Sequence, residues 1–255
     1  MTERVVIVNA DDFGRSVGVN RGIIQAHEHG IVTSASLMVR WPDAKQAAAY
    51  ARGDSLSVGL HLDLGESVYR DGEWHARYEV IAPQTADAVR GEVSSQLEQF
   101  ERLMGRPPTH LDSHQHVHFS EPTRTALVLA AERLGVPVRG FTPGITYSGA
   151  FYGQDGYELP FPDAITVEAL IGEIERLEPG VTEIGCHPAI HVDHDSTYGA
   201  ERIQELKTLC DPRISAAIVR CGISLRSFDE LDAARPAPHP RAPAPGQLAD
   251  PLDRQ

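Results

Sequence analysis

Short apolar runs, rich in β-branched residues, alternate along the chain with longer stretches in which apolar residues recur at helical spacing. Residues 93–104 show the helical pattern best, because an apolar residue recurs there every three or four positions and Gly105 follows as a helix end. The short runs predict strands at 5–9, 33–39, 56–62, 110–113, 136–139, 181–186 and 223–225. The helical spacing predicts helices at 19–29, 93–104, about 122–134, 167–177, 201–210 and 212–220. This alternation predicts an α/β fold with a parallel sheet or barrel.

The predicted elements fit one domain covering residues 1–233. A chain of 255 residues is long enough for a single α/β barrel or open sheet. Residues 234–255 differ, because Pro and Ala dominate there and no apolar face recurs. Such a composition cannot bury enough surface to offset its ordering entropy, so we expect a flexible C-terminal tail.

Composition argues against two kinds of partner. The chain has 23 Lys and Arg against 36 Asp and Glu, and its net charge of −13 would repel a phosphate backbone, so nucleic acid is not expected. The longest apolar runs fall far short of the roughly 20 residues that a membrane helix needs, so no membrane partner is expected. The three cysteines form no CxxC pair, which indicates reduced thiols. With no basic targeting segment at the start of the chain, we expect a cytoplasmic protein.

Titratable side chains stand where predicted strands end. Asp11 and Asp12 follow the first strand, and His61 closes the third. His114 and His187 follow two later strands. Because the carboxyl ends of parallel strands open on one shared face, these side chains are predicted to meet there.

Each of these residues also has a purely structural explanation. Asp12, followed by Gly14, suits a turn or helix cap, and His61 suits a histidine that is satisfied near the core. The segment 110–118 is harder to explain in this way, because alternation would place four histidines and Asp112 on one side of an extended strand. Imidazole and carboxylate groups together favour a divalent transition metal, and three protein ligands leave open positions, as in catalytic sites.

Two adjacent carboxylates suit hydrolysis at such a site. One can bind the metal, which lowers the pKa of coordinated water, and the other can accept the proton released as water attacks. A protonated histidine on the opposite side could then supply a proton to a departing amine, and His187 in the segment GCHPA suits that role.

The chain resembles the YdjC-like carbohydrate deacetylases. The resemblance lies in VNADDFG (8–14), GIVTSASLMV (30–39), GLHLDLG, GRPPTHLDSHQHVH and IGCHPA, and their order and spacing match to about residue 225. It implies an irregular (β/α) barrel, related to polysaccharide deacetylases, that removes the acetyl group from an N-acetylated sugar and releases acetate. It further implies a homodimer.

The resemblance also implies roles for the five residues. Asp12, His61 and His114 are the implied metal ligands, Asp11 the catalytic base and His187 the general acid. His116 and His118 are expected behind the ligands or facing the substrate. The metal implied by the family is Mg²⁺, although two imidazoles suit Zn²⁺, Co²⁺ or Mn²⁺ better than so hard an ion.

Substrate choice is expected to depend on two segments, 66–83 and 144–162, predicted as loops on the active face. Their aromatic residues could stack on a sugar ring or pack locally; these residues are Tyr69, Trp74, Tyr78, Tyr147, Phe151 and Tyr152. Arg139 could contact an acyl or hydroxyl oxygen, or form a surface ion pair.

Two alternatives remain open from the sequence. A metal-dependent phosphoesterase also uses Asp and His clusters at strand ends, although few basic residues stand next to these motifs to hold a phosphate. A non-catalytic sugar- or metal-binding protein is the other alternative, but binding a metal alone would require neither Asp11 nor His187.

Overall fold

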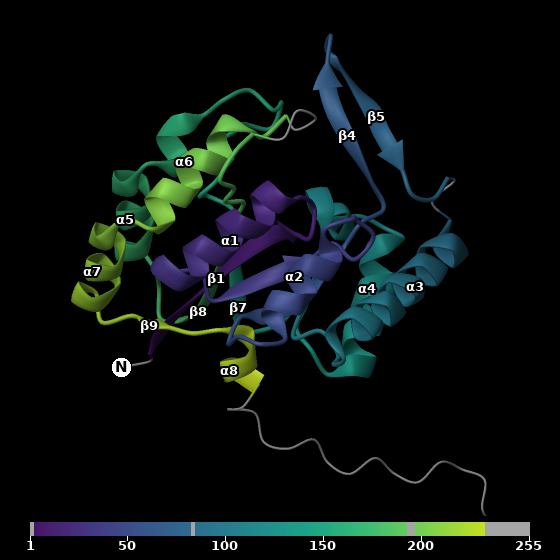
Figure 1. Ribbon diagram of the computed structural model, residues 1–255, viewed down its shortest axis with the longest axis horizontal. Helices are drawn as coiled ribbons and strands as arrows, with labels where there is room; N and C mark the ends of the chain where they lie inside the picture. The colour runs from purple at the N-terminus through teal and green to yellow at the C-terminus, as the bar shows by residue number, and fades with distance from the viewer. Residues whose placement is uncertain (1–2, 83–84, 193–196, 233–255) are drawn as a thin grey trace, which may run out of the picture.

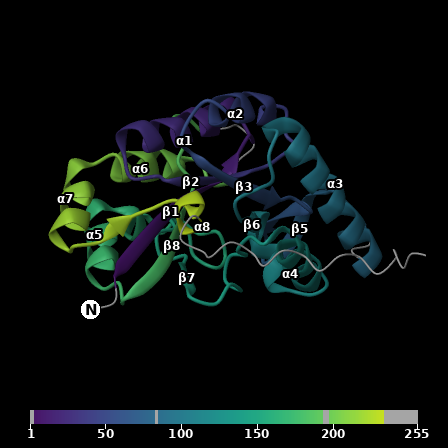
Figure 2. The ribbon, with the colours of Figure 1, turned by 90° about the horizontal axis from the view of Figure 1, so that it is seen from below.

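The computed structural model describes residues 3–82, 85–192 and 197–232. Seven of its strands form one parallel sheet in the order β6-β3-β2-β1-β8-β7, with β9 paired to the start of β1 (Figures 1 and 2). These strands are β1 (Arg4–Phe13), β2 (Ser34–Leu37), β3 (Ser57–Leu62), β6 (Leu111–Ser113), β7 (Ile145–Ser148), β8 (Gly180–Cys186) and β9 (Ser224–Leu225). Two further strands, β4 (Gly65–Arg70) and β5 (Glu73–Glu79), form a separate antiparallel hairpin.

Helices lie in an arc around the outside of the sheet (Figure 2). They are α1 (Val17–His29), α2 (Ala44–Ala51), α3 (Ala86–Met104), α4 (Thr123–Leu134), α5 (Val167–Glu175), α6 (Ala200–Leu209), α7 (Pro212–Arg220) and α8 (Phe228–Asp232), with short 3-10 helices η1 (His114–Phe119) and η2 (Pro162–Ile165). Between the edge strands β6 and β7, only a single bridge from Leu111 to Val138 extends the sheet within the described residues. The sheet is therefore a half-barrel, which confirms the predicted irregular α/β barrel. None of the described helices is long and apolar enough to cross a membrane.

Most predicted elements are present, and the differences have physical reasons. The segment 136–139 forms only that one bridge and no strand. The hairpin replaces the loop predicted at 66–83. Its strand β5 is largely exposed, so it lacks the alternation of apolar and polar residues by which a strand is predicted. The short helices α2 and α8 and the strand β7 were also not predicted. The predicted tail at 234–255 lies outside the described residues.

Strand β1 continues four residues beyond its predicted end and includes both acids. A regular strand would point Asp11 and Asp12 to opposite faces. Its pairing with β2 is irregular between Ala10 and Phe13, and Asp12 has a left-handed φ of 67°. Asp11 and Asp12 consequently both border the same cavity.

Helix α1 packs closely against the segment that follows β8. Its start is capped by Ser16, whose hydroxyl accepts the N–H of Val19 at 3.1 Å. At Gly22, a Cβ atom would lie 2.7 Å from the backbone nitrogen of Ala189. The absence of a side chain at this position thus allows the helix to approach residues 188–189, next to His187.

We expect Gly22→Ala to lower the free energy of unfolding by about 1–3 kcal/mol, because the added methyl group meets backbone atoms that cannot move independently. Chemical denaturation would measure this loss. Gly91→Ala is the matched control, since Gly91 is also helical but a Cβ there meets no atom within 4 Å. The control should gain about 0.5–1 kcal/mol from helix propensity. Equal effects of the two substitutions would contradict the close approach at Gly22.

Candidate metal and catalytic site

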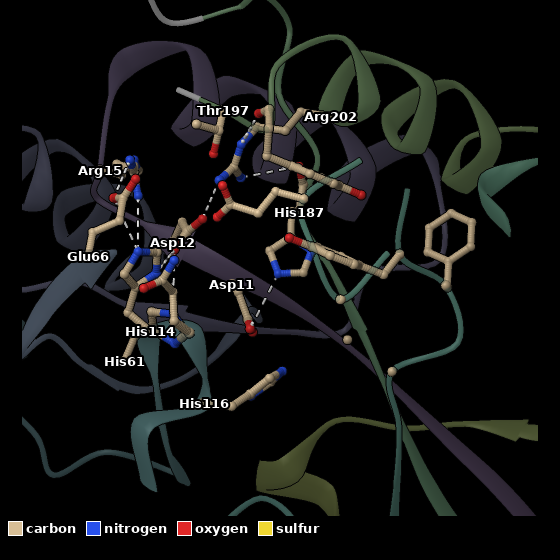
Figure 3. A pocket seen from close by; sticks show the side chains of 18 of the residues that line it. Asp11, Asp12, Arg15, His61, Glu66, His114, His116, His187, Thr197 and Arg202 are labelled. Carbon is tan, nitrogen blue, oxygen red and sulfur yellow. Dashed lines mark hydrogen bonds and ion pairs between the residues drawn. The ribbon is translucent and has the colours of Figure 1, made fainter. Parts of the chain in front are cut away.

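A cavity of about 490 Å³ opens at the carboxyl ends of the sheet strands. Its lining includes all five residues singled out in the sequence, Asp11, Asp12, His61, His114 and His187. They come from β1, β3, η1 and the turn after β8 (Figure 3). The structure therefore brings together the residues that the motifs predicted, and their individual roles stay predictions.

Asp12, His61 and His114 form a compact group that could hold a metal ion. One potential ligand atom from each residue lies within 4.8 Å of the others, and all three residues are buried. Asp12 Oδ1 lies 3.4 Å from His61 Nε2 and 3.1 Å from His114 Nδ1. One carboxylate oxygen and two imidazole nitrogens thus converge on one point.

The two oxygens of Asp12 have different surroundings. Oδ2 forms an ion pair with Arg202 of α6, whereas Oδ1 is buried and accepts no hydrogen bond within the described part of the chain. The groups that face Oδ1 are the two imidazole nitrogens, so a bound cation could be shared by this oxygen and both nitrogens. The donor set and this unsatisfied oxygen both fit a divalent ion.

His61 is oriented by a carboxylate behind it. Its Nδ1 lies 2.7 Å from Asp112 Oδ1, which leaves Nε2 facing Asp12. Metal-binding histidines commonly have such a carboxylate partner on the second ring nitrogen. Burial alone would lower the pKa of His61, but the carboxylates of Asp112 and Asp11 raise it to about 10.

His114 has partners that the sequence analysis missed. Its Nε2 lies 3.3 Å from Glu66 Oε2 on strand β4, and Glu66 pairs with Arg15 at 2.8 Å. Burial lowers the pKa of His114, but Asp12 and Glu66 raise it above its usual value. Glu66 lies far from the histidine motif in sequence, and the folded hairpin brings it to His114.

Asp11 is held by Arg139, which lies in the turn that follows the bridge at Val138. The guanidinium binds both Asp11 oxygens at 2.6 and 2.7 Å. The predicted surface ion pair for Arg139 is wrong, because Arg139 is buried and also binds Asp112 and Glu183. Its contact with an acyl or hydroxyl oxygen stays a prediction. Burial raises the pKa of Asp11, but Arg139 and His61 outweigh it and lower the pKa below its usual value.

His187 lies across Asp11 from the metal group. Its Nε2 is 3.7 Å from Asp11 Oδ2, and its Nδ1 is 3.7 Å from Glu205 Oε1. Glu205 is fully buried in α6 and also accepts the backbone N–H of His187 and the hydroxyl of Tyr198. No motif marks Glu205, because it stands within a helix, 18 residues after His187.

The segment 110–118 is not extended throughout. The strand ends at Ser113, and Gln115 and His116 have left-handed φ values of 48° and 52°. The prediction that alternation aligns all its histidines is therefore wrong. His118 is buried, with Nδ1 2.5 Å from Ser113 Oγ and Nε2 near the Arg139 carbonyl. His116 lines the cavity, 3.2 Å from the Tyr147 hydroxyl.

Basic residues do reach the site, although few of them stand next to the motifs in sequence. Arg15, Arg139 and Arg202 lie against it, but each is paired with carboxylates. The buried acids of the site outnumber these three arginines. The acids are Asp11, Asp12, Glu66, Asp112, Glu183 and Glu205. The arginines thus compensate buried negative charge and are not left available for a phosphate.

Comparisons with known proteins agree with these features. The model of the family described as "YdjC-like protein" matches residues 5–220. A carbohydrate deacetylase of Geobacillus stearothermophilus is 34% identical over 250 residues, covering 89% of this chain and 98% of the relative. A chitooligosaccharide deacetylase of Serratia marcescens is 33% identical over 259 residues, covering 90% of this chain and 100% of the relative.

Solved structures share the fold. A protein of Enterococcus faecalis, named provisionally for cellobiose-phosphate cleavage, has a TM-score of 0.73 at 27% identity and covers 90% of this chain and 99% of its own. A family 4 carbohydrate esterase of Streptomyces lividans, in complex with acetate, has a TM-score of 0.51 at 12% identity, with 88% and 92% covered. At that low identity the esterase supports the fold alone.

We expect Zn²⁺ binding at pH 7 to release at least one proton, because the pKa of His61 is raised to about 10, that of His114 is raised above its usual value, and both imidazoles must be neutral to bind an ion. Affinity should accordingly fall as the pH is lowered. Calorimetry in two buffers with different ionisation enthalpies would count the protons. Asp12→Ala, which removes the shared oxygen, should abolish both the binding and the release. Tight binding without proton release would show that both imidazoles are already neutral.

Proposed function

Because the chain belongs to the YdjC-like family, we propose that it is a metal-dependent deacetylase that hydrolyses the acetamide of an N-acetylated sugar and releases acetate. The observation that carries the proposal is the unsatisfied Asp12 Oδ1 between His61 and His114, with Asp11 beside it in one cavity. The deacetylase names of the two relatives support the choice of reaction.

Asp12, His61 and His114 would hold the metal. When bound, a divalent ion supplies a Lewis acid that polarises the acyl oxygen and makes water more acidic. Two imidazoles and one carboxylate suit Zn²⁺, Co²⁺ or Mn²⁺ on chemical grounds, whereas Mg²⁺ usually takes oxygen ligands. We therefore place the transition ions before the Mg²⁺ implied by the family resemblance.

Asp11 is the proposed base. Its lowered pKa keeps it ionised at neutral pH, so it can accept a proton from the attacking water. Both oxygens are already bound to Arg139, which fixes the carboxylate next to the metal ligands but also weakens it as a base. Transfer of the proton onward, towards the amine, would restore the Asp11–Arg139 pair.

His187 is the proposed acid. Its Nε2 faces Asp11, and Glu205 on the opposite side of the ring holds the segment through the His187 backbone. Protonated His187 would donate to the amine nitrogen as the bond to the acyl carbon breaks. Asp11 and His187 would thus act on opposite sides of the acyl group, one removing a proton from water and one supplying a proton to the leaving group.

The cavity suits a sugar. A volume of about 490 Å³ lies within the usual range for small-molecule sites, and aromatic rings of Tyr147, Phe151, Tyr152 and Tyr198 line it. The predominance of carboxylates disfavours a phosphorylated substrate, so the phosphoesterase alternative loses support. The homodimer and the cytoplasmic location stay predictions; the three cysteines are free, which is consistent with a reducing compartment.

The first experiment is acetate release from N-acetylglucosamine and from diacetylchitobiose, using chelated protein to which Mg²⁺, Zn²⁺, Co²⁺ or Mn²⁺ is restored in turn. Acetate released only after metal addition would support the proposal and identify the ions that serve. Absence of acetate from every sugar, despite tight metal binding, would favour a different substrate or a non-catalytic binding protein.

Variants should separate the metal ligands from the base. We expect Asp12→Ala and His114→Ala to lose metal and activity together, because each removes one of three ligand groups. Asp11→Asn should keep the metal and lower kcat by about 10²-fold or more. Metal content by elemental analysis, beside initial rates of acetate release, distinguishes the two classes. Full activity in Asp11→Asn would exclude Asp11 as the base.

A further inference from the structure

The β4–β5 hairpin stands apart from the sheet beside the cavity (Figure 1). Near its turn Tyr69 and Trp74 are paired across the two strands, with ring centroids 5.4 Å apart. Trp74 lines the cavity and yet remains 53% exposed. Ligand-binding surfaces commonly have a large, half-exposed apolar side chain at the edge of a cavity.

A second segment contributes a third ring. Tyr157, from the loop that precedes η2, lies 5.3 Å from Tyr69 between ring centroids. The next residue, Glu158, accepts the backbone N–H of Tyr69 at 3.1 Å through its carboxylate. Tyr69, Trp74 and Tyr157 form what we call the aromatic shelf. Two segments far apart in sequence therefore meet at the cavity edge, where Trp74 of one and Glu158 of the other line the cavity.

The shelf is fixed to the catalytic end of the sheet. The Gln115 side chain, next to His114, binds both the backbone N–H and the carbonyl of Ser67 at 2.8 Å. Glu66 pairs with Arg15 and lies 3.3 Å from His114. These contacts place β4 relative to the metal ligands before any substrate arrives, which reduces the ordering cost of binding.

We propose that the aromatic shelf binds a second sugar ring of the substrate, adjacent to the ring whose acetamide reaches Asp12, with Trp74 as the main contact. Sugar rings present C–H faces that stack on aromatic side chains, and Trp offers the largest such surface. This inference rests on the proposed function. It makes Trp74 a specificity residue that distinguishes oligosaccharides from single acetylated sugars.

Cross-strand pairing alone does not account for the shelf. A Tyr–Trp pair on facing positions of two strands can stabilise a hairpin. Pairing for that purpose does not require Tyr157 from a separate loop, nor does it explain why Trp74 faces the cavity.

The kinetic test compares diacetylchitobiose with N-acetylglucosamine. We expect Trp74→Ala to lower kcat/KM for the disaccharide about five- to tenfold, mainly through KM, and to leave the monosaccharide unchanged. Trp74→Phe should retain most of the wild-type preference. Phe161→Ala is the matched control, because Phe161 is equally exposed, at 53%, but does not line the cavity. An equal loss for both sugars, or no loss for either, would overturn the proposal.

A binding measurement separates this inference from the proposed reaction. Trp41 and Trp74 are the two tryptophans of the chain, so Trp41→Phe leaves Trp74 as the sole indole fluorophore. Diacetylchitobiose should change that fluorescence, and N-acetylglucosamine should change it little. Fluorescence change without acetate release would retain the shelf and reject the deacetylase. Acetate release without a fluorescence change would support the deacetylase and reject the aromatic shelf. If neither acetate nor a fluorescence change is seen, both proposals are rejected.

Discussion

The buried guanidinium of Arg139 neutralises carboxylates from three strands at once. It binds Asp11 of β1, Asp112 of β6 and Glu183 of β8, all at 2.6–2.9 Å. Without a cation there, three acids would lie together in a region that water does not reach, and each would be costly to ionise. Even with Arg139 present, burial raises the pKa of Glu183 to about 7. These three carboxylates therefore share Arg139 as their arginine partner, and their charge balance depends on it.

The same interaction connects the two halves of the site. Asp112 receives Arg139 on Oδ2 and His61 on Oδ1, while Arg139 also holds Asp11, which faces His187. A continuous chain of charged contacts thus runs from a proposed metal ligand to the proposed base and on to the proposed acid. Because neighbouring charges alter one another's pKa values, a change at any member is felt by the others. The site acts as one electrostatic unit, although its residues come from β1, β3, β6 and β8 and the segments that follow them.

Sequence patterns predicted all the sheet strands except β7, and the five central residues, because both depend on local signals. Buried parallel strands are continuous apolar runs, and the motif residues stand at their ends. Glu66, Arg202 and Glu205 gave no such signal, since each approaches the site through tertiary packing of a helix or of the hairpin. Arg15 directly follows the first motif, but its partner Glu66 is on the hairpin. The segment after Ser113 differs from the predicted extended strand for a related reason. Its alternating histidines resemble a strand, but Gln115 turns out of the strand direction to bind Ser67 on β4.

The residues proposed for the reaction and those proposed for substrate choice therefore lie in different parts of the molecule. The proposed reacting groups are buried at the ends of sheet strands, where a shift of one side chain disturbs a shared charge network. The hairpin lies outside that sheet, and its outer strand β5 is mostly exposed, so its side chains can change with little effect on the core. Only the base of the hairpin, through Glu66 and the Ser67 backbone, is tied to His114 and its neighbour Gln115. An active site built in this way can keep one reaction while its outer surface adapts to sugars of different length.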